Sequence, residues 1–173
     1  MSAVGVVVGN PKARSRTLDV GVAVAQASAA AAGVDDHDMV VVDLVDLGSQ
    51  LFDWSSPAVR EVVDAVSACS LLVVASPTYK ASYTGLLKSF LDWFSTTGLR
   101  DVVTVPVMVG AGAGHALAVE VHLRPVLVEI GATLPTRGLY VLESDLSKLD
   151  AVIAQWLADA GPALRQALQL RIW

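Results

Sequence analysis

A basic segment near the N-terminus has the residue types of a phosphate-binding site. Three cations and two hydroxyl side chains fall within it: Lys12, Arg14, Arg16, Ser15 and Thr17. The segment follows a short apolar run, Val4 to Val8, and precedes a long helical pattern. A helix N-terminus offers unpaired backbone amides and a partial positive charge, so the order of strand, loop and helix suits an anion. A solvated basic loop would have the same composition, and the sequence leaves that alternative open.

A second segment, Ser76 to Phe94, closes one apolar run and opens a helix. The run before it, Leu71 to Ala75, is continuously apolar, as expected of a parallel strand covered on both faces. Pro77 cannot continue a strand ladder, so the chain should leave the sheet there, with a helix beginning near Thr84. The intervening polar loop could support a planar ring on its backbone amides. It could also be only a connecting turn.

Five strands alternating with five helices must position these two segments. Apolar periodicity predicts strands at about 3–8, 38–44, 71–75, 104–109 and 136–142. It predicts helices at about 16–32, 57–68, 84–95, 115–131 and 146–169. This alternation predicts a doubly wound α/β fold with a parallel sheet of order 2-1-3-4-5. The loops after the first and third strands should then flank one crevice.

Three motifs in this order resemble those of the flavodoxin-like NAD(P)H-dependent FMN reductases. They are the segment from Gly9 to Thr17, the segment from Pro77 to Lys88, and the glycine-rich stretch from Gly110 to His115. The resemblance is closest to the branch that supplies reduced flavin to two-component monooxygenases such as those of alkanesulfonate metabolism, where an Arg/Lys-Pro helix follows, as Arg124-Pro125 does here. It covers nearly the whole chain and implies a single flavodoxin-like flavin-binding domain over residues 1–173.

The resemblance also implies which residues bind the cofactor. They are Asn10, Lys12, Ser15, Arg16, Thr17, Pro77, Thr78, Tyr79, Lys80, Gly110, Ala111, Gly112 and Ala113. The family usually has Ser at the position of Asn10 and Arg at the position of Lys12, so Lys12 would give a point contact where Arg gives a fork. We expect backbone amides around Thr78 to Lys80 and Gly110 to Ala113 to hold the edge of the flavin ring.

The activity implied is hydride transfer from C4 of NADPH or NADH to N5 of FMN. The cofactors would supply the reactivity, so we predict no catalytic side chain. The implied partners are free flavin, nicotinamide and a flavin-dependent monooxygenase. Three alternatives stay open: a quinone or azo reductase with tightly bound FMN, a flavodoxin-type electron carrier, and a flavin-free scaffold. The charged phosphate loop argues against the carrier, since such carriers usually bind phosphate with uncharged hydroxyl residues.

Composition excludes other classes. The 173 residues are 54% hydrophobic with mean hydropathy +0.57, and the net charge is −5 with a pI near 5.0. An acidic chain of this kind is a poor nucleic-acid partner. Charged residues interrupt every apolar stretch and no signal pattern opens the chain, so we expect a cytoplasmic protein without a membrane partner. Cys69 is the only cysteine, and neither His115 nor His122 has metal-ligand spacing to other ligands, so we predict no metal.

Pro125 lies deep in the predicted fourth helix and removes one backbone N–H. We therefore expect a kink or π-bulge between about 120 and 125, which would display His122 and Arg124. In the family that the chain resembles, the corresponding helix packs across a subunit interface. Residues 117–127 are therefore predicted to form a contact in a homodimer or homotetramer.

Overall fold

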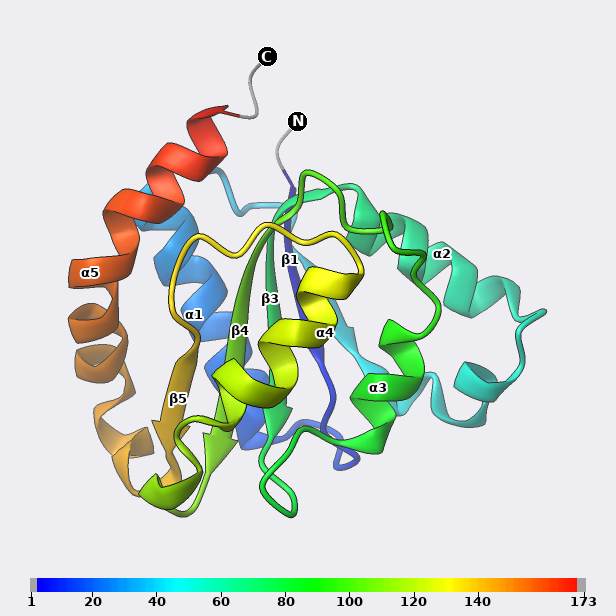
Figure 1. Ribbon diagram of the computed structural model, residues 1–173, viewed down its shortest axis with the longest axis horizontal. Helices are drawn as coiled ribbons and strands as arrows, with labels where there is room; N and C mark the ends of the chain where they lie inside the picture. The colour runs from blue at the N-terminus through cyan, green and yellow to red at the C-terminus, as the bar shows by residue number, and fades with distance from the viewer. Residues whose placement is uncertain (1–2, 171–173) are drawn as a thin grey trace.

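Five parallel strands form one sheet of order β2-β1-β3-β4-β5 in the computed structural model, which describes residues 3–170. The strands are β1 (Ala3–Val8), β2 (Val40–Asp43), β3 (Cys69–Pro77), β4 (Val103–Gly110) and β5 (Leu139–Leu142). This confirms the predicted flavodoxin-like, doubly wound fold. The carboxyl ends of all five strands lie at one edge of the sheet, the lower edge in Figure 1.

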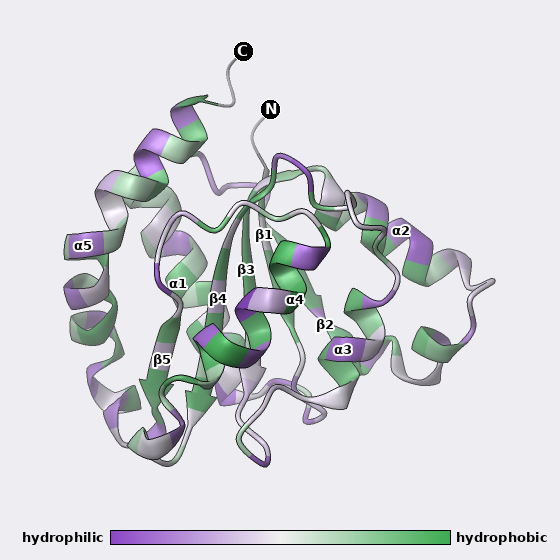
Figure 2. Cartoon of the chain, viewed as in Figure 1, coloured by the Kyte–Doolittle hydropathy of each residue, from purple (hydrophilic) through white to green (hydrophobic). Residues whose placement is uncertain are grey.

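Helices cover both faces of the sheet. They are α1 (Arg16–Ala32), α2 (Pro57–Ser67), α3 (Gly85–Leu91), α4 (Arg124–Glu129) and α5 (Leu149–Gln169). α1 and α5 pack on one face, and α2, α3 and α4 pack on the other (Figure 1). Because the central strands are covered twice, they are apolar along their length, as Figure 2 shows.

The connections contain short helical segments of tighter or wider pitch. The 3₁₀ segments are η1 (Leu44–Asp46), η2 (Gly48–Phe52), η3 (Ala113–His115) and η5 (Glu143–Lys148). The segment η4 (Val119–Leu123) is a π-helix. η3 and η4 together join β4 to α4, so the chain approaches α4 by two irregular turns.

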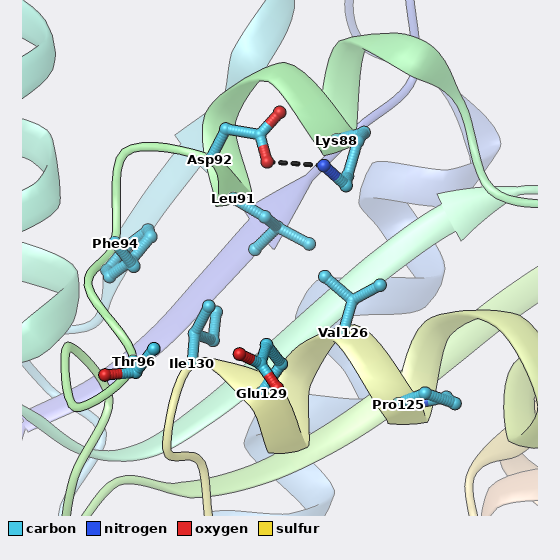
Figure 3. A pocket seen from close by; sticks show the side chains of 9 residues that line it. All are labelled: Lys88, Leu91, Asp92, Phe94, Thr96, Pro125, Val126, Glu129 and Ile130. Carbon is cyan, nitrogen blue, oxygen red and sulfur yellow. Dashed lines mark hydrogen bonds and ion pairs between the residues drawn. The ribbon is translucent and has the colours of Figure 1, made fainter.

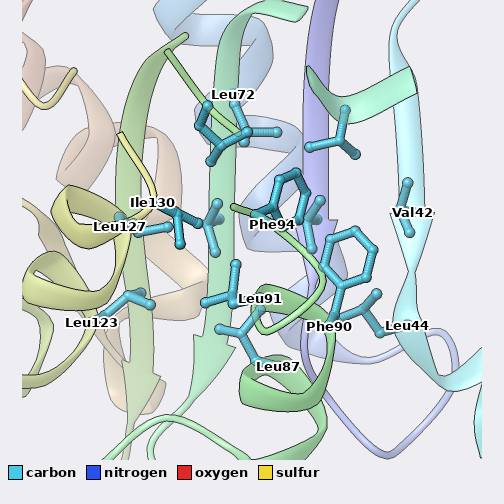
Figure 4. Packing of buried hydrophobic residues seen from close by; sticks show 14 of the residues in the cluster. Val42, Leu44, Leu72, Leu87, Phe90, Leu91, Phe94, Leu123, Leu127 and Ile130 are labelled. Atoms are coloured by element: carbon cyan, nitrogen blue, oxygen red, sulfur yellow. The ribbon is translucent and has the colours of Figure 1, made fainter. Parts of the chain in front are cut away.

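Packing against α4 and the sheet fixes α3, which lies within the second predicted segment. Leu87, Phe90 and Leu91 of α3 are buried against the sheet, beside Leu123 and Leu127 (Figure 4). Aromatic packing reinforces this cluster, since the rings of Phe90 and Phe94 meet edge to face with centroids 5.3 Å apart. Burial of these side chains anchors α3 and therefore the loop that precedes it.

Two strands begin later than predicted. β2 starts late because the Asp35 carboxylate accepts a hydrogen bond from the His37 N–H and holds the chain in a turn. β5 begins only at Leu139, because backbone groups of the preceding loop are hydrogen-bonded to the side chains of Glu120 and Arg124 instead of to β4. Local sequence patterns contain neither of these contacts.

α3 ends at Leu91, earlier than the predicted helix. The N–H groups of Trp93 and Phe94 donate to carbonyls three residues back, those of Phe90 and Leu91, at 3.1 and 3.2 Å. The last turn is therefore tightened in the 3₁₀ manner. As a result, the Phe94 side chain lies in the core. A continued α-helix would have pointed it in another direction.

The predicted irregularity before Pro125 is confirmed. The chain forms the π-helix η4, and α4 begins directly after it with Pro125 in its first turn. A proline lacks the N–H that an α-helix interior requires but fits a first turn. The wide turn thus converts an interior proline into an N-terminal one.

Candidate flavin site at the carboxyl edge of the sheet

The loop after β1 is closed by its own side chains. The Gly9 N–H donates to the Ala75 carbonyl at 2.8 Å, which ties the loop to β3. The Asn10 Oδ1 accepts the Lys12 N–H at 2.9 Å, and its Nδ2 donates to Thr17 Oγ1, also at 2.9 Å. Asn10 and Thr17 are buried. These two predicted site residues therefore shape the loop.

The N-terminus of α1 carries backbone amides that have no acceptor in the described part of the chain. Ser15 is its N-cap, and its Oγ accepts the Leu18 N–H at 3.3 Å. Within residues 3–170, no acceptor meets the backbone N–H groups of Arg16 and Thr17. Donors without an acceptor in residues 3–170, at the positive end of a 17-residue helix, suit an anion.

The three cations of this loop differ in their partners. The Arg16 guanidinium lies 3.1 Å from the Glu143 carboxylate at the start of η5, in an exposed pair. Neither Lys12 nor Arg14 has a carboxylate within ion-pair distance in the described part of the chain. Lys12 and Arg14 thus have no carboxylate partner in the described residues, whereas Arg16 pairs with Glu143.

Asp43, at the end of β2, supports the same loop. Its Oδ2 accepts the backbone N–H of Arg14 at 3.2 Å, and Arg14 has a left-handed φ of 51°. Burial raises the pKa of Asp43, and its Oδ1 is buried without a partner among residues 3–170. The sequence pattern alone did not indicate Asp43. The only available signal was an acid at the carboxyl end of a strand beside the switch point.

The loop after β3 folds back as a tight hairpin. The Tyr79 N–H donates to the Ser82 carbonyl at 2.9 Å, and the Ser82 N–H donates to the Tyr79 carbonyl at 3.1 Å. Between them Lys80 and Ala81 both have positive φ, 51° and 65°, as in a type I′ turn. The expectation that the Tyr79 amide addresses the flavin is wrong, because that amide is already bonded. The Tyr79 side chain is 52% exposed.

Thr84 joins the first loop to the second. Its hydroxyl donates to the Gly9 carbonyl and accepts the Leu87 N–H at 3.1 Å as the N-cap of α3. Its backbone N–H donates to Ser76 Oγ at 3.1 Å. A Cβ at Gly9 would overlap the Leu87 side chain, so only glycine lets α3 approach this closely. The sequence indicated Thr84 only as the start of a helix.

The glycine-rich loop after β4 is adjacent to Thr78. The Thr78 N–H donates to the Val109 carbonyl at 2.7 Å, so this amide is also occupied, but its Oγ1 is buried with no partner in the described chain. A Cβ at Gly110 would lie 3.0 Å from that Oγ1 and would overlap the Tyr140 hydroxyl. The Tyr140 hydroxyl donates to the Gly112 carbonyl at 3.0 Å. Tyr140 thus belongs to this site, which its sequence context did not indicate.

The predicted residues are therefore distributed over three loops at one edge of the sheet. These loops follow β1, β3 and β4, which are consecutive in the sheet (Figure 1). Of the amides predicted to hold the ring edge, those of Thr78 and Tyr79 are bonded. Those of Gly112 and Ala113 have no acceptor within residues 3–170.

A side-chain clamp holds the π-helix to the loop before β5. The Glu120 carboxylate accepts the Gly138 N–H and, at 2.7 Å, the Nε–H of Arg124. The Arg124 guanidinium also donates to the carbonyls of Leu134, at 3.2 Å, and Thr136. The prediction that Arg124 is displayed is wrong, since only 25% of its side chain is exposed.

Large apolar side chains are exposed on η4 and α4 and in the turn just before them. Leu117, Val121 and Val128 are exposed there, and His122 is exposed as predicted. A groove of about 390 Å³ separates α4 from α3 (Figure 3). Its lining contains none of the predicted cofactor residues: Lys88, Leu91, Asp92, Phe94, Thr96, Pro125, Val126, Glu129 and Ile130.

Among residues 3–170, no group of three or more His, Cys, Asp or Glu side chains is arranged to hold a metal ion. Over the same range, no helix has the length and apolarity to cross a membrane. The sequence-based expectation of no metal stays a prediction.

Comparison with known proteins assigns the family. The family model for NADPH-dependent FMN reductase matches residues 2–146. That range includes all three loops and every residue predicted to bind the cofactor. The chain belongs to the NADPH-dependent FMN reductase family.

Individual relatives agree with this family. The FMN reductase (NADPH) of Escherichia coli strain K12 is 33% identical over 93 residues, which are 54% of this chain and 49% of that protein. The NADH-dependent FMN reductase SfnF of Pseudomonas putida is 34% identical over 142 residues, 79% of this chain and 75% of that protein. The apo crystal structure of the NADH:FMN oxidoreductase EMOB superposes with a TM-score of 0.82 at 27% identity, covering 98% of this chain and 90% of that one. This chain thus spans about half the length of the Escherichia coli relative.

Proposed function

We propose that this protein is an NAD(P)H-dependent FMN reductase that supplies reduced flavin to a partner monooxygenase. The observation that carries the proposal is the bonding of Gly9, Ser76 and Thr84, which fixes two loops beside the first amides of α1, for which residues 3–170 offer no acceptor. These loops flank the topological switch point, where doubly wound folds bind their ligands. Family membership supports FMN as that ligand.

The residues present fit FMN. Lys12, Ser15 and Arg16, with the loop shaped by Asn10 and Thr17, would hold the phosphate at the N-terminus of α1. The ring would lie against two segments, Pro77 to Lys80 and Gly110 to Ala113. The buried Thr78 hydroxyl, which lies beside Gly110, lacks a partner among the described residues. A bound polar ligand would satisfy that hydroxyl.

The protein's part in the reaction is placement. FMN supplies the hydride acceptor, and NADPH or NADH supplies the hydride. The fixed loops would hold the flavin and nicotinamide rings in the relative orientation that hydride transfer needs. Backbone donors at Gly112 and Ala113, unpaired in the described chain, would stabilise negative charge on the reduced ring without any acid group.

The proposal can be tested by titrating the apoprotein with FMN and then measuring the steady-state rates of NADPH and NADH oxidation. The acceptors FMN, FAD, a quinone and oxygen should be compared in parallel. Fast NAD(P)H oxidation that requires FMN, with FMN exchanging as a substrate, is the expected result. Turnover of the quinone on permanently bound FMN would favour a quinone reductase. No FMN binding at all would overturn the proposal.

Two further properties go with this function. A second copy of the chain would cover the apolar face of η4 and α4, giving a homodimer or homotetramer. The exposure of Leu117, Val121 and Val128 supports this arrangement. A cytoplasmic location would give access to NADH and NADPH. Sedimentation of the purified protein tests the assembly.

A further inference from the structure

Tyr140 reaches the glycine-rich loop from the neighbouring strand. It lies opposite Met108 in the pairing of β4 with β5, close to the point where β4 ends. Its ring is half-buried against the core under α3 and α4, and its hydroxyl fills the space that a Cβ at Gly110 would need. From there it donates to the Gly112 carbonyl at 3.0 Å. The same carbonyl accepts the His115 N–H at 3.2 Å.

This contact orients a peptide group. A trans peptide is planar, and its C=O and N–H point in opposite directions. Because the Gly112 carbonyl points toward Tyr140 and His115, the N–H of Ala113 in the same plane points away from them. No residue between 3 and 170 accepts that N–H. The donor is therefore fixed in direction and left for a ligand.

We propose that Tyr140 is a positioning residue, which through Gly112 holds the Ala113 amide as a donor toward the ring edge of bound flavin. This inference rests on the proposed function. A flavin ring gains negative charge at its N1 edge on reduction, and hydrogen bonds to charged acceptors are stronger than those to neutral ones. The Tyr140 hydroxyl should therefore favour reduced FMN over oxidised FMN.

The test uses Tyr140→Phe, which removes the hydroxyl and keeps the ring that fills the core. Tyr83→Phe is the matched control, since Tyr83 is also partly buried and its hydroxyl has no hydrogen bond within residues 3–170. The dissociation constants of oxidised and reduced FMN and the midpoint potential of the bound couple are measured for each protein. Tyr140→Phe should weaken reduced FMN by about tenfold more than oxidised FMN. For a two-electron couple this equals a potential lower by about 30 mV.

A second measurement on the apoprotein separates the peptide geometry from flavin binding. The carbonyl ¹³C shift of Gly112 and the amide shift of Ala113 should change in Tyr140→Phe and stay as in wild type in Tyr83→Phe. Unchanged shifts would overturn the inference, as would changed shifts with an unaltered ratio of the two FMN affinities. In both cases FMN binding by wild type leaves the proposed function standing. If wild type binds no FMN, the proposed function fails and the inference fails with it.

Discussion

The Thr84 hydroxyl donates a hydrogen bond to the Gly9 carbonyl, 75 residues earlier in the chain. This one contact connects the end of β1 to the start of α3, across the switch point of the sheet. Both groups are buried, so neither can exchange the bond for one to water. The bond therefore holds the loop after β1 and the loop after β3 at a fixed separation.

Thr84→Ala should destabilise the fold by about 1–3 kcal/mol, because it removes a helix N-cap and leaves the buried Gly9 carbonyl unpaired. FMN affinity should fall as well, since the two loops lose their connection. Urea unfolding gives the stability, and FMN titration gives the affinity. Thr84→Ser keeps the hydroxyl and should stay close to wild type. Equal losses in the Ser and Ala variants would show that the methyl group, and not the hydroxyl, stabilises this junction.

Arg16 is shared between Glu143 and the proposed phosphate. If the guanidinium serves FMN, Glu143 competes for it in the free protein. Glu143→Gln should then tighten FMN binding modestly, by up to about 1 kcal/mol for an exposed pair, and Arg16→Ala should weaken it. Raising the salt concentration should reduce both effects. Weaker binding by Glu143→Gln would mean that the ion pair orders the loop and that Arg16 does not meet the phosphate.

Asp43 gives a pH-dependent prediction. Burial raises its pKa above the ordinary value of 3.8, so the charged form is disfavoured in the folded protein. Its contribution to stability is therefore present at low pH and lost as the pH rises through the raised pKa. Asp43→Asn keeps an acceptor for the Arg14 N–H without the charge. At neutral pH this variant should be more stable than wild type and should bind FMN more tightly, since one negative charge near the phosphate is gone.

The measurement for Asp43 is urea unfolding across a pH series, with exposed Asp64→Asn as the control. The advantage of Asp43→Asn should shrink as the pH falls through the raised pKa of Asp43, where wild type loses its charge. A gap that grows toward low pH would mean that the carboxylate stabilises the loop as an anion.

The places of the three loops could be predicted from the sequence because local chemistry marks them. Apolar runs end at Gly9, Pro77 and Gly110, and topology then brings the carboxyl ends of parallel strands to one edge. The π-helix was equally predictable, since the missing N–H of Pro125 is a property of one residue. Features of this kind need no knowledge of distant partners.

The partners of the loops could not be predicted, because they come from elsewhere in the chain. Tyr140, Asp43 and Glu143 reach the site from β5, β2 and η5, and each pairing depends on tertiary packing. For the same reason, the sequence could not show that the Thr78 and Tyr79 amides are already hydrogen-bonded. The hydrogen bond from Tyr79 to Ser82 depends on positive φ at Lys80 and Ala81, which are not typical turn residues for that conformation.

Arg124 should matter for stability and not for assembly directly. Arg124→Ala breaks its contacts to Glu120 and to two backbone carbonyls, and should cost about 2–3 kcal/mol because these groups are partly buried. Arg124→Lys keeps the charge without the planar fork and should lose an intermediate amount. Exposed Arg100→Ala is the control for urea unfolding. A loss no larger than that of Arg100→Ala would show that the clamp does not hold the loop before β5.

The assembly is better tested at Val121, which is 57% exposed on the outer face of η4 and contacts no clamp group. If a second copy covers this face, Val121→Glu buries a charge at the contact and should weaken association by at least about tenfold, or 1.4 kcal/mol. Leu170→Glu, on an exposed leucine after α5, changes an apolar side chain on the opposite face and should leave association unchanged. Sedimentation at micromolar concentration measures the states, and FMN reduction should fall with the lost assembly. A monomeric wild-type protein would contradict the proposed interface, and η4 would then be explained within one subunit by Pro125 and the Glu120 clamp.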